Sequence, residues 1–130
     1  MIHSFKVLTT LSAYRVVSCV TGTAFTVQYP GAVTHMPIGI TKDTVKDTTG
    51  AIPVAGVGER AMLYFNDTCA SGELVKSDSS GRGARWTIAP DTTTSLTLSG
   101  AYVGVLLGAT IALTGTIAEI LVQPGIAKGI

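Results

Sequence analysis

Histidine is the side chain most often used as a base near neutral pH, and this chain has two, His3 and His35. Nucleophilic catalysis needs a nucleophile, a base and an orienting group held together, and two histidines offer few ways to build that arrangement. His35 is followed by Met36 and Pro37, without an Asp, Glu or Cys at the spacing of metal ligands. We therefore interpret His35 as a loop or interface residue, and we expect no catalytic residue and no bound metal.

Four acidic residues could bind a cation or carry out acid–base chemistry. Asp43 and Asp47 resemble oxygen ligands for calcium, but no glycine-containing acidic loop with a terminal Glu follows them, which favours a solvated loop. Asp67 and Glu73 flank a turn, and nothing near them predicts a raised pKa or a substrate cleft, so Asp67 is interpreted as a turn former. Gly81-Arg82-Gly83 lacks the full glycine pattern and the following helix of a phosphate-binding loop. We expect no cofactor.

The arginines and the single tryptophan have chemistry suited to binding another protein. A guanidinium group forms bidentate ion pairs and is enriched at protein interfaces, although ordinary surface charge is the alternative for each arginine. The tryptophan could pack in the core or anchor an interface. The candidate interface residues of these two types are Arg15, Arg60, Arg82, Arg85 and Trp86.

Few charged residues are available to keep the surface solvated. Charged residues make up 13% of the 130 residues, about half of the roughly 25% usual for soluble domains, while hydrophobic residues at 46% are ordinary. Thr, Ser and Gly take their place, which suits a surface covered by other protein. The net charge of +1 predicts no direct contact with nucleic acid. One domain is expected at this length.

The two cysteines and the first residues indicate where the chain folds. Cys19 and Cys69 lie far apart in the sequence beside strand-like residues, and we interpret them as small buried hydrophobic residues rather than a disulfide. The opening residues MIHSFKVLTTL lack the basic cluster, apolar run and cleavage site of a secretory signal. The prediction is a protein that folds in a cytoplasm.

The elements that must position these residues are predicted to be short strands. Fifteen glycines with frequent Thr, Val and Ile disfavour helix and favour strands separated by turns. Residues 13–20 and 24–29 resemble a hairpin around Gly22. Further strands are expected at residues 36–42, 52–67 and 72–77, with a surface loop at 43–50 and a loop or edge strand at 91–100. Turns every 8–12 residues are typical of a β-barrel or β-sandwich, which this pattern does not separate.

Residues 101–118 carry no charge and could be taken for a membrane span. Glycines at 104, 108 and 115 divide the segment, threonines dilute it, and no Lys or Arg anchors its ends. Strands fit better, with a turn near Gly115 and a last strand that ends at Gln123-Pro124-Gly125. Apolar residues on both faces then predict a strand buried on both sides or packed against a neighbouring subunit.

The first residues differ from the rest of the predicted domain. Phe5 and Val7 alternate with polar residues, and Thr9 and Thr10 are strand-prone. We expect residues 1–12 to form an extended N-terminal arm that adds a strand to a neighbour, with Phe5 and Val7 in the interface, and residues 13–130 to form one β domain.

The order of these signals resembles the head decoration, or cement, proteins of tailed bacteriophages. In that family a Gly-Glu-Leu-Val step leads into an Asp-x-x-Gly-Arg turn, and this chain has that step at residues 72–75 and that turn at residues 78–82. The family's chains often end with a hydrophobic strand and a proline, as residues 122–124 do here. The resemblance covers most of the chain.

The resemblance implies an all-β barrel or sandwich that assembles in the host cytoplasm and sits on the outside of a phage capsid, commonly as a homotrimer. Its partners would be the major capsid protein and further copies of itself, and its function would be to stabilise the shell by bridging capsid subunits. Two alternatives stay open: a small β-sandwich module that binds a host-surface glycan, and a membrane-associated protein held by residues 101–118. With 6% aromatic residues the glycan alternative has few side chains for a sugar platform, and an enzyme is the weakest alternative.

Overall fold

The computed structural model describes residues 2–7, 9–20, 22–30, 37–44, 51–86 and 101–126. Every regular element in these ranges is a β-strand, which confirms the all-β prediction. The strands are β1 (Ile2–Val7), β2 (Val16–Cys19), β3 (Thr26–Gln28), β4 (Pro37–Thr41), β5 (Ala51–Ala55), β6 (Arg60–Tyr64), β7 (Leu74–Ser77), β8 (Gly83–Arg85), β9 (Ala101–Leu106) and β10 (Ile117–Ile126). Residues 45–50 and 91–100, expected as loops or an edge strand, lie outside the described residues.

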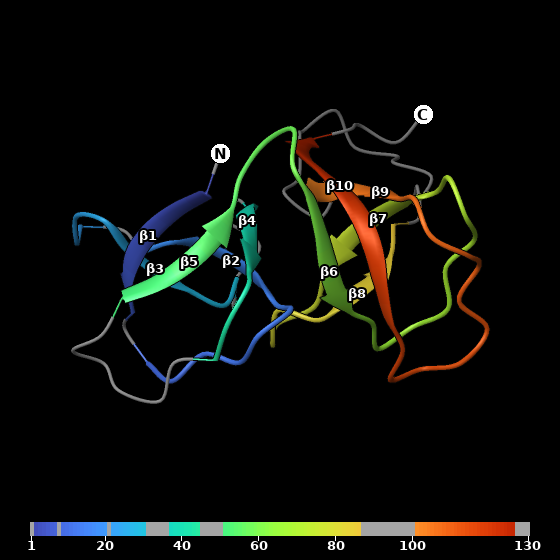
Figure 1. Cartoon of the computed structure of the whole chain (residues 1–130), viewed down its shortest axis with the longest axis horizontal. Coiled ribbons are helices and arrows are strands. Elements are labelled where there is room, and N and C mark those ends of the chain that lie inside the picture. Colours follow the sequence, from blue (N-terminus) through green and yellow to red (C-terminus); the bar gives the residue numbers. More distant parts are fainter. Residues whose placement is uncertain are drawn as a thin grey trace, which may run out of the picture.

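The first five strands close into a barrel in the order β1-β3-β2-β4-β5, on the left of Figure 1. Strands β2 and β3 form the predicted hairpin, in which Cys19 pairs with Val27, and Gly22 supplies a positive φ of 83° in the turn. The barrel interior is apolar, with Leu11, Val17 and Ile52 fully buried. The sequence pattern therefore located β2 to β5 correctly, and the structure decides for a barrel.

The first strand corrects the expected N-terminal arm. Strand β1 pairs with β5 over five residue pairs from Ile2–Ala55 to Lys6–Ala51, and it also runs parallel to β3. Val7 is buried in the barrel, and Phe5 packs against the same cluster. The alternating pattern did indicate a strand that needs a partner, but the partner is in the same chain, because β1 closes the barrel.

The last five strands form a second sheet in the order β6-β10-β9-β7-β8, on the right of Figure 1. This sheet curls so that its two outer strands approach each other at one end. Phe65, just after β6, forms a bridge with Gly83 of β8, and the Asn66 amide donates to the Gly83 carbonyl at 2.9 Å. Toward Arg60, β6 makes no backbone hydrogen bond on this side to any residue that the structure describes.

Residues 101–118 form a strand, a loop and the start of another strand, so this segment is not the single membrane-spanning helix that the alternative would need. Strand β9 pairs with β7 and β10, and Leu106 and Ile111 are buried in the core of the sheet. In the described part of the chain, no helix is long and apolar enough to cross a membrane. Glycine disfavours a helix, and threonine and valine favour strands, so the composition of this segment decided its structure over its mean hydropathy.

The last strand also continues further than predicted. Strand β10 runs to Ile126, and its register against β9 shifts between Val122 and Gly125. Proline lacks a backbone donor, and a bulge is where a strand tolerates it, so Pro124 interrupts the pairing without ending the strand.

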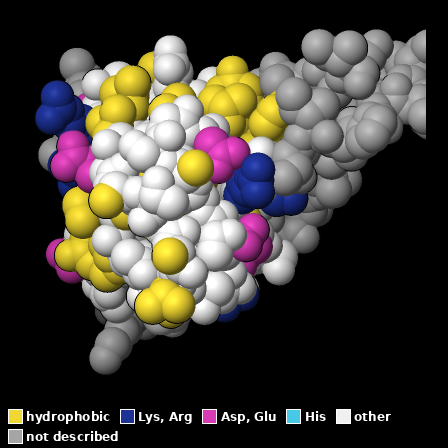
Figure 2. All heavy atoms as spheres, turned by 90° about the vertical axis from the view of Figure 1, so that its right-hand side faces the viewer, with side chains coloured by type: hydrophobic (Ala, Val, Ile, Leu, Met, Phe, Trp, Pro, Cys, Tyr) yellow, Lys and Arg dark blue, Asp and Glu magenta, His cyan; other side chains and the backbone are white. Residues whose placement is uncertain are grey.

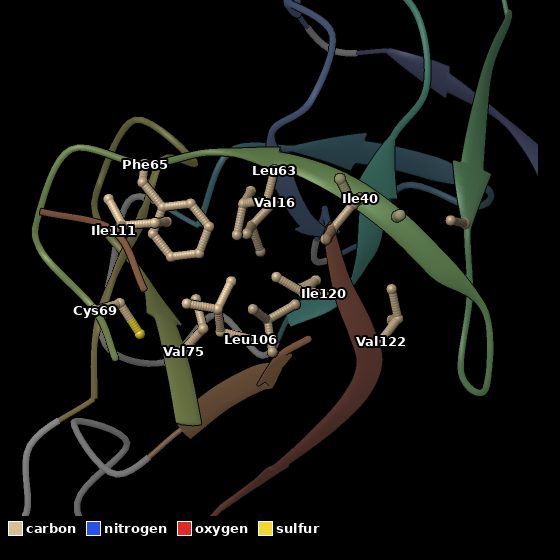
Figure 3. Packing of buried hydrophobic residues seen from close by; sticks show 13 residues of the cluster. Val16, Ile40, Leu63, Phe65, Cys69, Val75, Leu106, Ile111, Ile120 and Val122 are labelled. Atoms are coloured by element: carbon tan, nitrogen blue, oxygen red, sulfur yellow. The ribbon is translucent and has the colours of Figure 1, made fainter. Parts of the chain in front are cut away.

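One hydrophobic core joins the barrel to the sheet. Val16 and Ile40 of the barrel belong to the same buried cluster as Leu63 and Ile120 of the sheet, as Figure 3 shows. The Val16 amide also donates to the Gly81 carbonyl at 2.7 Å. The two halves are therefore expected to unfold together, because neither can expose its part of this cluster without cost.

Candidate functional site

Arg82, one of the candidate interface residues, holds a turn within its own chain. The Asp78 carboxylate accepts hydrogen bonds from the Ser80 and Arg82 amides, each at 2.9 Å, and from the Arg82 Nε at 2.8 Å. Gly81 has a positive φ of 76°, and a Cβ there would lie 2.6 Å from the Val16 carbonyl oxygen. The amides that a phosphate would need are therefore already engaged by Asp78, and the turn has a structural role.

Arg15 stacks on an aromatic ring at the junction between the barrel and the sheet. Its guanidinium carbon lies 4.5 Å from the centre of the Tyr64 ring, which is cation–π geometry. The neighbouring Tyr14 has a positive φ of 62° and is held at both ends, since its amide donates to the Thr41 carbonyl and its carbonyl accepts from the Tyr64 amide, both at 2.9 Å. Arg15 therefore stabilises the junction.

Arg60 and Arg85 are the most exposed of the candidate arginines. The Arg60 side chain is 76% exposed and lies 3.7 Å from the Glu119 carboxylate, while the Arg85 Nε lies 3.1 Å from the Glu73 carboxylate. Exposed pairs of this kind contribute little to stability, about 0–1 kcal/mol. Both guanidinium groups therefore remain accessible to a binding partner, and their interface role stays a prediction.

The hydrophobic candidates pack inside the chain. Trp86 is 9% exposed and meets Tyr102 edge to face, with the ring centres 6.3 Å apart. Phe5 and Val7 belong to the barrel interior, as described above. Core packing thus accounts for Trp86, and no described aromatic cluster forms a flat platform around it.

The acidic candidates mainly cap turns. Asp67 accepts from the Thr68 amide at 2.8 Å, as expected of a turn former, and Asp43 accepts from the Thr44 amide at 2.9 Å. Glu73 accepts from the Ala70 amide at 2.7 Å. His35 and Asp47 lie outside the described residues, and of His3 only the backbone in β1 is described. In the ranges that the structure covers, no three His, Cys, Asp or Glu side chains come together to hold a metal ion.

The two cysteines are unpaired thiols in different environments. Cys69 is 2% exposed, and its burial, together with the nearby Glu73 carboxylate, raises the pKa of the thiol from 9.0 to about 11. Cys19 is exposed on β2, which corrects the expectation that both would be buried. Neither forms a disulfide. The raised pKa makes Cys69 a poor nucleophile at neutral pH.

The segment that joins β9 to β10 presents an uncharged surface at the end of the sheet remote from the barrel, which we call the distal face, and Glu73 and Arg85 lie beside it. It is made by residues 107–117, where Leu107, Leu113 and Ile117 are exposed, and Leu113 is 75% exposed. Figure 2 shows this end of the molecule, where polar atoms and scattered hydrophobic side chains cover most of the surface and several acidic and basic side chains lie beside them. The uncharged run in the sequence was the signal for this surface, and the structure shows which of its side chains point outward.

A second feature, missed by the sequence reasoning, is a cleft between the barrel and the sheet. It has a volume of about 300 Å³ and is open to solvent. Residues from four separate parts of the chain line it: Tyr14, Thr41, Lys42, Arg60, Ala61, Met62 and Glu119. No local sequence pattern could have brought these segments together.

The class of fold is now defined as a closed five-stranded barrel joined through a common core to a curled five-stranded sheet. No family model matches the chain, and no curated protein matches it. Among solved structures, the chain is similar to the head fiber gp8.5 N base of bacteriophage phi29, with a TM-score of 0.67 at 11% sequence identity. The match covers 95% of this chain and 93% of that one. At this identity the likeness establishes a shared fold.

Proposed function

We propose that this chain is a structural protein of a bacteriophage virion, attached to the outside of the head. The observation that carries the proposal is the fold, which follows the base of a phage head fiber over nearly the whole length of both chains. The resemblance of residues 72–75 and 78–82 to head decoration proteins supports it independently, because that comparison rests on sequence signals. In this proposal the chain is not an enzyme and uses no cofactor.

The distal face supports attachment to a protein surface. Exposed apolar side chains on an uncharged background lose little solvation when covered, and each buried Leu or Ile contributes about 1.5–3 kcal/mol. Leu107, Leu113 and Ile117 are such side chains. We propose that this face binds the major capsid protein and that neighbouring copies assemble as trimers, so that each assembly bridges capsid subunits. Modest contacts then add up, because linked sites bind with increased avidity.

The test is attachment to phage heads that lack the protein, measured by co-sedimentation. Leu113→Asp is expected to weaken attachment by at least about tenfold, since a charge would be buried at the contact. Phe25→Asp is the matched control, because Phe25 is equally exposed, at 77%, but lies in the β2–β3 turn of the barrel. Wild-type protein that stays in the supernatant would contradict the proposal, and equal effects of both variants would contradict the role of the distal face.

The glycan-binding alternative gains no support from the described residues. Sugar sites commonly use an exposed Trp or Tyr ring as a platform, but Trp86 is buried against Tyr102, and the more exposed rings in the described residues are those of Phe25 and Tyr14. No second function is therefore proposed.

A further inference from the structure

Strand β6 has a hydrogen-bonding edge that faces the cleft. It pairs with β10 on one side, from Arg60–Leu121 to Tyr64–Ile117, and it is an outer strand in the order β6-β10-β9-β7-β8. Just after Tyr64, the edge of β6 that faces away from β10 is occupied, because Phe65 forms a bridge with Gly83 of β8. The segment from Arg60 to Met62 lies instead along the open cleft.

The hydrogen bonds around β6 show which backbone groups face the cleft. The Tyr64 amide donates to the Tyr14 carbonyl at 2.9 Å, so it points away from β10. Backbone groups repeat every two residues in an antiparallel ladder, and those of Met62 and Arg60 therefore point the same way. The pairing of the neighbouring strand β10 supports this direction. Glu119 lies across from Met62, and its carbonyl accepts from the Leu107 amide of the β9 side at 3.0 Å, so it points away from β6.

The cleft also places two cations beside this edge. Lys42 lies on the barrel wall and Arg60 on the sheet wall. Each has a carboxylate only at a loose distance, 4.0 Å from Lys42 to Glu59 and 3.7 Å from Arg60 to Glu119. Of the charged side chains lining the cleft, two are positive and one, that of Glu119, is negative. An acidic side chain on the occupant could therefore pair with both cations, in competition with Glu59 and Glu119.

We propose that the cleft binds a single extended peptide segment of a partner protein, which adds a strand to β6 and places an acidic side chain between Lys42 and Arg60. Only an extended backbone offers donors and acceptors at the two-residue spacing of Arg60 and Met62. Tyr14, Thr41 and Lys42 form the wall that faces β6, so the occupant would lie between that wall and the strand edge. This proposal rests on the proposed function in one respect: if the chain attaches to a phage head, a capsid protein would supply the peptide segment.

Amide hydrogen exchange tests the free edge without any ligand. The amides of Ala61 and Leu63, which point toward β10, are expected to be protected, while those of Arg60 and Met62 exchange at least about tenfold faster. Equal protection along the strand would overturn the proposal, because the edge would then already be paired.

Peptide binding tests the site itself, by NMR titration with an acetylated Thr-Val-Glu-Val-Thr peptide and its counterpart with Lys in place of Glu. The acidic peptide is expected to shift the Arg60 and Met62 amide signals, with the lysine peptide at least about tenfold weaker. Met62→Pro removes the amide that faces the cleft and should weaken binding at least about tenfold, whereas Met62→Ala keeps that amide and should bind like wild type.

Charge reversal gives a second variant in case the proline substitution disturbs folding. Arg60→Glu is expected to lower the preference for the acidic peptide over the lysine peptide at least about tenfold. No shift at Arg60 and Met62 with millimolar acidic peptide would overturn the proposal. So would self-association of the protein that Met62→Pro abolishes, since a second copy would then be the occupant. Neither result uses phage heads, so this proposal can fail while attachment to heads still holds.

Discussion

Replacing Ile40 by alanine removes a side chain that the barrel and the sheet share. Ile40 is fully buried in the cluster that contains Leu63 and Ile120. Truncation of a buried Ile to Ala costs about 2–5 kcal/mol, from lost burial and from the cavity left behind. A loss of about 3 kcal/mol would lower the urea midpoint by about 1.5 M if the slope is about 2 kcal/mol per M.

The assay follows urea unfolding with two signals. Trp86, the only tryptophan, follows β8 and reports on the sheet, while far-UV circular dichroism reports on all strands. Because the core is shared, Ile40→Ala is expected to shift both transitions together, although Ile40 belongs to the barrel. Ile38→Ala is the control on the same strand, since Ile38 is partly buried and packs only against the barrel cluster, and its effect should be smaller. A variant in which the Trp86 transition stays at the wild-type midpoint would refute the shared core.

Three further predictions concern the turn and the thiols. Asp78→Ala removes the acceptor for two backbone amides and for the Arg82 Nε, so it should lower the free energy of unfolding by about 2 kcal/mol, more than Asp67→Ala, in thermal or urea unfolding. A thiol reagent should modify Cys19 in the native protein and Cys69 only after unfolding, as read by mass spectrometry of peptides; rapid native labelling of Cys69 would contradict its burial. Because the pKa of Cys69 is raised from 9.0 to about 11 in the folded chain, its contribution to stability is complete below pH 9 and is lost as the pH rises toward 11. The free energy of unfolding of Cys69→Ala should not fall in this way between pH 9 and 11, so an equal fall in both proteins would contradict its assignment to Cys69.

The turns were the part of the fold that the sequence predicted best. Gly22, Gly58, Gly72, Gly81 and Gly115 all have positive φ, which glycine adopts without strain, and each lies in or beside a turn of the structure. Because turns fix where strands begin and end, most of the strands between them were found as well, although β8 was not predicted. The turn at residues 78–82 follows the same rule, with Asp78 as its acceptor.

Strand partners could not be predicted from local pattern. The alternation at Phe5 and Val7 indicates a strand, but the same alternation fits a partner in this chain or in a neighbour. Closure of the barrel by β1 depends on the position of β5, which lies about 50 residues later in the sequence. Tyr14 is a similar case, since its positive φ is imposed by hydrogen bonds to Thr41 and Tyr64 and has no signal in its own side chain.

The candidate site likewise has one part that the sequence predicts and another that depends on the folded arrangement of the chain. The uncharged run that forms the distal face was visible as composition, because it needs only one continuous segment. Arg82 and Trp86 were recognised as special residues, but their roles inside the chain depend on Asp78 and Tyr102. The cleft beside β6 was not predictable, since Lys42 and Arg60 meet there only after the barrel and the sheet have packed together.

A cryo-electron microscopy map of the phage particle that contains this chain tests the central claim most directly. We expect density on the outer surface of the head that fits the barrel and the curled sheet, with Leu113 and the rest of the distal face against the capsid protein. A particle whose outer surface shows no such density, although the protein is abundant in the infected cell, would contradict a structural role on the head.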